Sequence, residues 1–311
     1  MVRSGKPDLG VRINKLNLKN PVMAASGTFG YAEEFKDLMD LKKLGAVVTK
    51  TITLKPRPGN PPPRICETPS GMLNSVGLEN PGIDAFISTK LAFLKKLGIP
   101  LIVSIAAEES PVEFEILIGK LEAVKEIAAI ELNISCPNLR KDKLVSQDAG
   151  DTAAVVGAVR KLTSKILITK LSPNVTCITD IAMAAEDAGS DALALINTLS
   201  GMRIDVRKRI PMLGSRSGGL SGPAVRPVAV KMVWDVYNKI KIPIIGMGGI
   251  MDVESALEFF IAGASAVSLG TVNFVNPGAC LEVISGLERY MINNRIPDLS
   301  RLTGSLKLCQ D

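Results

Sequence analysis

The sequence predicts a closed (β/α)8 barrel of the TIM type, with a small N-terminal β-hairpin and long loops at the active-site end. Eight short apolar runs alternate with longer amphipathic runs, which is typical of parallel strands covered by helices. No glycine-rich dinucleotide turn follows the first run, and this favours a closed barrel over an open doubly wound sheet. With 46% hydrophobic residues in 311, we expect one domain over 1–311.

The predicted elements follow from these runs in chain order. An alternating apolar and polar stretch at 11–19 predicts the hairpin beneath the barrel. Continuous apolar, β-branched runs predict strands at 21–25, 46–53, 100–106, 129–135, 166–171, 192–199, 243–247 and 266–270. Amphipathic patterns predict helices at 33–44, 111–127, 152–162, 178–188, 224–240 and 253–262. The connections 54–81 and 200–222 are too long for ordinary turns, so we expect functional loops there.

Composition narrows the possible functions. Lys and Arg exceed Asp and Glu by 37 to 31, the charge of +6 is spread along the chain, and aromatics make up only 4%, so we expect no nucleic-acid partner. No run resembles a secretory signal or a membrane span, so we expect a cytoplasmic protein that does not enter a membrane. The five cysteines match no zinc or iron–sulfur spacing. Histidine is absent, which excludes Ser-His-Asp and Cys-His catalysis and His-ligated metals, and we expect no metal.

Polar side chains stand at the carboxyl ends of four predicted strands. These residues are Lys50 and Thr51, Asn133 and Cys136, Lys170, and Asn197 and Thr198. Because barrel enzymes place their active sites at this end, we expect these side chains to share one site. Gly248 and Gly249 after the seventh strand, with Gly270 and Thr271 after the eighth, predict a phosphate site and therefore a phosphorylated cofactor. Lys170 is placed to stabilise the anion of a reduced flavin.

Three segments carry a family resemblance. They are ELNISCPN at 131–138, MLNSVGLENPG at 72–82 and GGLSGPA at 218–224, and together they resemble the class 1 dihydroorotate dehydrogenases. The residues NTLSGM at 197–202, followed by Ile204 and Asp205, are similar to the catalytic subunit of subclass 1B. The resemblance extends roughly from Val11 to Leu287.

The resemblance implies an FMN-dependent oxidation of dihydroorotate to orotate in de novo pyrimidine (UMP) biosynthesis. Cys136 matches the base of the family. Lys50 matches the lysine that contacts both the substrate and the flavin. The implied substrate residues are Lys50, Asn74, Ser75, Val76, Gly77, Leu78, Asn133, Asn197 and Thr198. The implied FMN residues are Ala25, Ser26, Gly27, Lys50, Thr51, Ser104, Asn133, Lys170, Ile196, Gly222, Gly248, Gly249, Gly270 and Thr271. Ser104 stands where the family usually has an asparagine against the flavin.

The subclass also implies partners. Its catalytic chains form a homodimer core and pair with an electron-transfer subunit that carries FAD and a 2Fe–2S cluster, giving a heterotetramer with NAD as the final acceptor. Alternatives remain a fumarate-linked subclass 1A enzyme, another dihydropyrimidine dehydrogenase, and a tRNA dihydrouridine synthase. The last is disfavoured because only about twenty residues follow Tyr290, too few for an RNA-binding helical domain.

Overall fold

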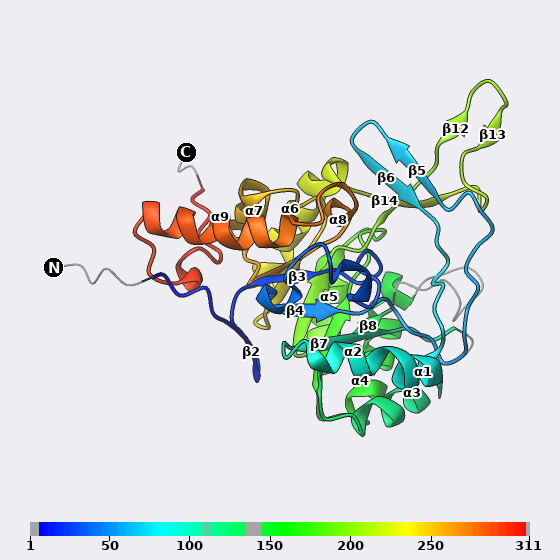
Figure 1. Cartoon of the computed structure of the whole chain (residues 1–311), viewed down its shortest axis with the longest axis horizontal. Helices are drawn as coiled ribbons and strands as arrows, with labels where there is room; N and C mark the ends of the chain where they lie inside the picture. Colours follow the sequence, from blue (N-terminus) through cyan, green and yellow to red (C-terminus); the bar gives the residue numbers. More distant parts are fainter. Residues whose placement is uncertain (1–5, 109, 111, 135–144, 309–311) are drawn as a thin grey trace.

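A closed eight-stranded parallel barrel forms the centre of the protein, in the order β10-β15-β16-β3-β4-β7-β8-β9 (Figure 1). The computed structural model describes residues 6–108, 110, 112–134 and 145–308. The barrel strands are β3 (Val22–Ala24), β4 (Ala46–Val48), β7 (Leu101–Ile105), β8 (Ile127–Asn133), β9 (Ile166–Lys170), β10 (Ala192–Leu195), β15 (Ile244–Gly246) and β16 (Ala266–Leu269). The predicted (β/α)8 fold class is therefore confirmed, although most strands are shorter than expected.

The barrel interior is a packed apolar core that is closed at one end by the N-terminal hairpin. Strands β1 (Val11–Ile13) and β2 (Leu16–Leu18) pair antiparallel, as predicted. Ile13 and Leu18 from the hairpin join Met23, Val48 and Ile168 from the barrel in one buried cluster. Because the hairpin end of the barrel is filled by side chains, the carboxyl ends of the strands are the end where a ligand site is expected.

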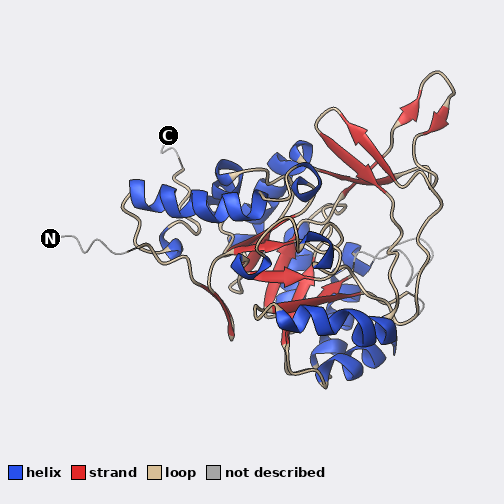
Figure 2. Ribbon diagram, viewed as in Figure 1, coloured by secondary structure: helices blue, strands red, loops and turns tan. Residues whose placement is uncertain are grey.

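Helices cover the outside of the barrel (Figure 2). Five of the predicted helices are confirmed, as α3 (Val112–Glu122), α4 (Ala149–Arg160), α5 (Ile178–Asp187), α6 (Arg226–Tyr237) and α7 (Val253–Ala262). Further helices that we did not predict are α1 (Ile83–Ala85), α2 (Leu91–Lys96), α8 (Val272–Val275) and α9 (Ala279–Asn293), with the short π-helix η3 (Phe86–Lys90). Short 3-10 turns lie at η4 (Val145–Gln147), η5 (Pro223–Val225) and η6 (Leu299–Arg301).

The predicted helix at 33–44 is wrong. Two 3-10 turns, η1 (Glu33–Phe35) and η2 (Leu41–Lys43), stand in its place. Ala32 enters η1 with φ +65°, and Asp40 is extended and caps η2 by accepting a hydrogen bond from the backbone N–H of Lys42. Phe35 turns inward and stacks on Phe29, with ring centroids 3.9 Å apart. The apolar periodicity of this segment therefore reflects packing of turns on the core.

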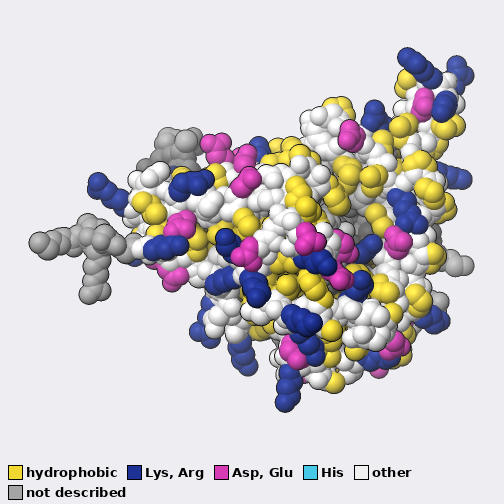
Figure 3. Space-filling view, viewed as in Figure 1, with side chains coloured by type: hydrophobic (Ala, Val, Ile, Leu, Met, Phe, Trp, Pro, Cys, Tyr) yellow, Lys and Arg dark blue, Asp and Glu magenta, His cyan; other side chains and the backbone are white. Residues whose placement is uncertain are grey.

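The two long connections pair with each other and form a second sheet above the barrel. The strands β5 (Ile65–Thr68), β6 (Gly71–Asn74), β11 (Leu199–Gly201) and β14 (Gly218–Ser221) form an antiparallel sheet in the order β11-β14-β6-β5. The second connection also extends a two-stranded arm, β12 (Ile204–Asp205) and β13 (Ile210–Pro211), whose tip carries lysine and arginine (Figure 3). We expected functional loops at these positions, and much of their length is regular sheet.

Glycines in β14 allow this sheet to approach its neighbours closely. A Cβ atom at Gly219 would lie 2.0 Å from Oγ1 of Thr198, and one at Gly218 would lie 2.4 Å from the carbonyl oxygen of Asn74. A side chain at Gly219 would therefore push the sheet away from the barrel rim, and one at Gly218 would push β14 away from β6 within the sheet. No helix among 6–108, 110, 112–134 and 145–308 has the length and apolar character needed to cross a membrane.

A capping box fixes the start of α7, which follows the glycine pair Gly248-Gly249. The Asp252 carboxylate accepts the N–H of Ser255 at 2.9 Å, and Ser255 Oγ accepts the N–H of Asp252 at 2.9 Å. The Ser255 hydroxyl also lies 2.7 Å from Asp252 Oδ1, and the hydrogen bonds that the Ser255 N–H and hydroxyl donate to this carboxylate lower the pKa of Asp252.

We expect Asp252→Ala to lower the free energy of unfolding by about 1 kcal/mol at neutral pH. Because the folded-state pKa is depressed, this contribution is present above the unfolded pKa of about 3.9 and is lost as pH falls through the folded value. Urea denaturation of both proteins at pH 7 and at lower pH measures the difference. If the wild type and Asp252→Ala differ by the same free energy of unfolding at both pH values, the stabilising role of the ionised Asp252 carboxylate is contradicted.

Candidate active site

A cavity of about 420 Å³ lies between the carboxyl ends of the barrel strands and the sheet of the two long connections. This volume is in the range of small-molecule and cofactor sites. The predicted residues that line it are Ala25, Ser26, Gly27, Lys50, Thr51, Asn74, Ser75, Val76, Gly77, Leu78, Asn133, Lys170, Ile196, Asn197, Thr198, Gly222, Gly248, Gly249, Gly270 and Thr271. Of the predicted site residues that the structure describes, only Ser104 is not in this lining. Cys136 lies outside the described residues.

Ser104 lies one layer behind the cavity wall. It is fully buried, and its Oγ is 3.0 Å from Oγ1 of Thr51. Thr51 in turn accepts a 3.2 Å hydrogen bond from Nδ2 of Asn133, and Asn197 Nδ2 makes a long 3.5 Å contact to Oδ1 of Asn133. Ser104 is therefore placed to orient Thr51 and, through it, the Asn133 amide that faces the cavity.

Two lysines give the cavity a positive character. Lys170 is 5% exposed, and its Nζ donates a 3.2 Å hydrogen bond to Ser26 Oγ. Lys50 lines the same cavity, and its backbone N–H is held by the carbonyl of Gly30 at 2.8 Å. Among the described lining residues there is no Asp, Glu, His, Tyr or Cys. Two ammonium groups without an opposing carboxylate favour anionic ligands.

The segment Val76–Leu78 is a turn at the cavity whose backbone N–H groups are not used within the described protein. Gly77 and Leu78 have φ of +76° and +52°. The three carbonyl groups are held by Asn60 N–H to Val76 O (3.0 Å), Arg57 Nε to Gly77 O (3.1 Å) and Asn80 Nδ2 to Leu78 O (2.7 Å). Within the part of the chain that the structure describes, the N–H groups of these three residues have no acceptor. Successive amides of this kind form concavities that bind carboxylate or phosphate.

A second group of amides surrounds the ends of β15 and β16. In the described residues, the N–H groups of Gly248, Gly249, Gly270 and Thr271 have no protein acceptor. Gly249 has φ +79°, and a Cβ there would lie 2.7 Å from the carbonyl oxygen of Gly222. Close backbone approach and several amide donors match the needs of a phosphate group.

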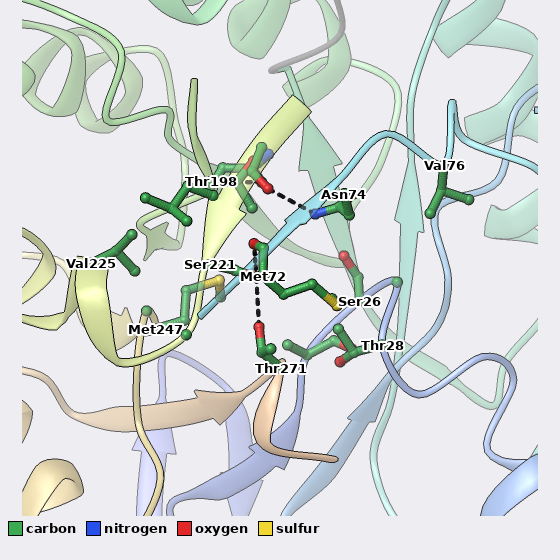
Figure 4. A pocket seen from close by; sticks show the side chains of 18 of the residues that line it. Ser26, Thr28, Met72, Asn74, Val76, Thr198, Ser221, Val225, Met247 and Thr271 are labelled. Carbon is green, nitrogen blue, oxygen red and sulfur yellow. Dashed lines mark hydrogen bonds between the residues drawn. The ribbon is translucent and has the colours of Figure 1, made fainter. Parts of the chain in front are cut away.

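The upper wall of the cavity comes from β6 and β14 (Figure 4). Asn74 Nδ2 donates to the carbonyl of Gly219 at 3.3 Å, and Thr271 Oγ1 lies 2.7 Å from Ser221 Oγ, so the hydroxyl pair links this wall to the β16 end. Our sequence reasoning missed several lining residues, among them Thr28, Asn60, Met72 and Met247. Asn60 lies in a proline-rich loop with no motif of its own, so only the tertiary structure identifies it.

The described cysteines lie away from the cavity. Cys66, Cys177 and Cys280 are free thiols that do not line it, and burial raises the pKa of Cys280 to about 12. Cys136 lies outside the described residues, as does Cys309. In sequence Cys136 follows Asn133, which lines the cavity, by three positions.

Comparison with known proteins identifies close relatives. The family model described as dihydroorotate dehydrogenase matches residues 8–291. A protein of Trichlorobacter lovleyi is 53% identical over 303 residues, covering 97% of this chain and 99% of the relative. A protein of Desulforudis audaxviator is 54% identical over 301 residues, covering 96% and 98%, and one of Geobacter sulfurreducens is 50% identical over 304 residues, covering 97% and 99%. Each of the three is named dihydroorotate dehydrogenase B (NAD(+)), catalytic subunit.

Proposed function

The chain belongs to the dihydroorotate dehydrogenase family, and we propose that it oxidises dihydroorotate to orotate in pyrimidine biosynthesis. One observation carries the proposal. The cavity combines Lys50 and the amides of Val76–Leu78, which suit a carboxylate, with the side-chain amides of Asn74, Asn133 and Asn197. A cyclic imide carries both N–H and C=O groups, and asparagine both donates and accepts.

The cavity also fits FMN, which has one phosphate and an electron-accepting ring. We assign the phosphate to the unpaired amides of Gly248, Gly249, Gly270 and Thr271, together with Gly222. The ring would lie along Ala25, Ser26, Gly27, Lys50, Thr51, Asn133, Lys170 and Ile196. Ser104 would act on this site through Thr51. When bound, FMN supplies the acceptor for the hydride that leaves the substrate.

Substrate orientation is the first task of the chain's own residues. Lys50 and the amides of Gly77 and Leu78 would hold the carboxylate, and the asparagines with Thr198 would hold the ring. Several fixed donors and acceptors on one small ring leave it a single productive orientation, which lowers the entropy cost of reaching the transition state.

Proton removal is the second task, and we assign it to Cys136. The thiolate of Cys136 would take the proton from the carbon next to the ring carbonyl, while the hydride leaves the neighbouring carbon. The substrate thus loses one hydrogen as a proton and another as a hydride, which carries both electrons. The only ionisable side chains in the described lining are Lys50 and Lys170, and the positive charge of both is needed for anions. Nearby ammonium groups also favour a thiolate over a thiol.

The partner proposal rests on the relatives. Their names specify a catalytic subunit and NAD(+), so an electron-transfer partner is implied for them, and NAD is favoured over fumarate. We propose the same for this chain, with FAD and a 2Fe–2S cluster carried by the partner subunit and a homodimer of the catalytic chain at the centre of a heterotetramer.

We expect Lys50→Ala to reduce the preference for dihydroorotate over dihydrouracil, which lacks the carboxylate. Loss of a charge-assisted hydrogen bond of about 1.5–3 kcal/mol corresponds to a fall of about 10- to 150-fold in kcat/KM for dihydroorotate. Turnover of both substrates with a small dye as acceptor measures this preference without the partner subunit.

Lys55→Ala is the matched control, because Lys55 is an exposed lysine five positions after Lys50 that does not line the cavity. Flavin content is measured for each variant, so that loss of cofactor is separated from loss of substrate binding. Equal losses with both substrates in Lys50→Ala would contradict the carboxylate assignment, and a wild-type protein without turnover of dihydroorotate would contradict the proposed function.

A further inference from the structure

The two long connections are joined by a chain of hydrogen bonds that passes through Ser75. Asn60 Nδ2, in the first connection, donates to Ser75 Oγ at 2.8 Å and to Ser75 O at 3.2 Å. On its other side, Ser75 Oγ is 2.5 Å from Oγ of Ser215, which belongs to the second connection. Ser215 Oγ donates to the carbonyl of Ser217 at 2.9 Å.

Ser75 Oγ accepts a hydrogen bond from each connection. The Asn60 amide donates to it from the first connection, and the Ser215 hydroxyl donates to it from the second. A hydroxyl oxygen has two lone pairs, so Ser75 Oγ can accept both bonds at once. The single proton of the Ser215 hydroxyl is shared between Ser75 Oγ and the carbonyl of Ser217. We call the side chains of Asn60, Ser75 and Ser215 the serine relay.

The neighbours of Ser215 hold it against the first connection. Leu213 is buried in a cluster with Cys66 and Leu73. The N–H of Gly214 donates to the carbonyl of Pro63 at 2.9 Å, and a Cβ at Gly214 would lie 2.6 Å from the carbonyl oxygen of Pro61. The position of Ser215 is therefore fixed by the packing of the two residues that precede it.

The serine relay ends where the anion-binding amides begin. Ser75 lines the cavity and directly precedes Val76, whereas Ser215 does not line it. Gly77 packs on the relay as well, since a Cβ there would lie 2.5 Å from Oδ1 of Asn60. A shift of Ser75 would therefore move the amides of Val76–Leu78 relative to Lys50.

We propose that Ser215 is a positioning residue for substrate binding, acting through Ser75 on the amides that receive the carboxylate. The inference rests on the proposed function, because it takes the carboxylate of dihydroorotate or orotate as the anion. It extends the binding site to a part of the second connection that does not line the cavity. Ser215 is then expected to affect binding of the substrate more than the chemical step.

The test uses the purified flavin-bound chain and the variants Ser215→Ala, Ser215→Thr and Ser75→Ala. The dissociation constant of orotate is measured from the change in flavin absorbance, and kcat and KM for dihydroorotate are measured with a dye acceptor. We expect Ser215→Ala to raise the dissociation constant and KM by about 3- to 10-fold, as for loss of one hydrogen bond, with kcat changed less than about twofold. Ser215→Thr keeps the hydroxyl and should restore affinity.

Two controls separate the relay from a general structural effect. Ser285→Ala removes an exposed hydroxyl that donates to the Glu282 carbonyl at 3.0 Å, and should leave affinity unchanged. In the Ser75→Ala background the relay is already broken, so adding Ser215→Ala should cost nothing further. If orotate binds the wild type and binds Ser215→Ala with the same affinity, the relay is overturned while the proposed function stands. The same holds if the losses of affinity in Ser215→Ala and Ser75→Ala add fully in the double variant. A wild-type flavin that does not respond to orotate would instead contradict the proposed function.

Discussion

Replacing Cys136 with alanine is expected to abolish reduction of the bound flavin by dihydroorotate while leaving the flavin bound. General acid–base catalysis contributes about 10²- to 10⁴-fold, so the anaerobic reduction rate should fall by at least this range. Stopped-flow absorbance of the flavin measures the rate, and the spectrum before mixing measures flavin content. Because the thiolate is the active form, the wild-type rate should rise with pH.

We expect this loss because the described lining of the cavity offers no other side chain suited to act as the base. Its described lining has no carboxylate, phenol, thiol or imidazole, and the whole chain has no histidine. Cys177→Ala is the matched control, since this cysteine is exposed and does not line the cavity. Cys136→Ala with a normal reduction rate would show that another group removes the proton.

Replacing Gly249 with alanine is expected to release most of the flavin from the purified protein. Gly249 has φ +79°, and a Cβ there would lie 2.7 Å from Gly222 O and 3.0 Å from Arg226 N, so backbone on both sides would have to move. These are the segments to which we assign the phosphate. The ratio of flavin to polypeptide after gel filtration measures the loss, and circular dichroism checks that the barrel remains folded.

Gly98→Ala separates steric from conformational effects. Gly98 also has a positive φ, +64°, but a Cβ there would meet nothing within 4 Å. Both variants carry the left-handed backbone penalty of about 1–2 kcal/mol, and only Gly249→Ala adds a backbone clash at the cavity. Equal flavin content in the two variants would contradict the assignment of the phosphate to this turn.

The barrel could be predicted because its signals are local. Each strand is a short apolar run, and helix α7 was predicted at its observed bounds, because its capping residue Asp252 and the Gly263 that follows it mark both ends in the sequence. The polar residues at strand ends could also be predicted to meet, since parallel strands in a barrel bring their carboxyl ends to one face.

The upper sheet and the relay could not be predicted, because they depend on contacts between distant segments. Strand β14 is mostly small residues with weak strand propensity, and it pairs with β6, about 145 residues earlier in the chain. Asn60 and Ser215 carry no motif, and their role becomes visible only when both connections are placed against Ser75. The helix expected at 33–44 failed for a related reason, since a left-handed residue and an extended one interrupt an apparently helical pattern.

The central claim is that the protein oxidises dihydroorotate in this cavity, with bound FMN as the first electron acceptor. Anaerobic mixing of the purified flavin-bound chain with dihydroorotate tests it most directly, with dihydrouracil in a parallel sample. We predict rapid bleaching of the flavin absorbance by dihydroorotate and little or none by dihydrouracil. A flavin that stays oxidised in the presence of dihydroorotate would contradict the claim.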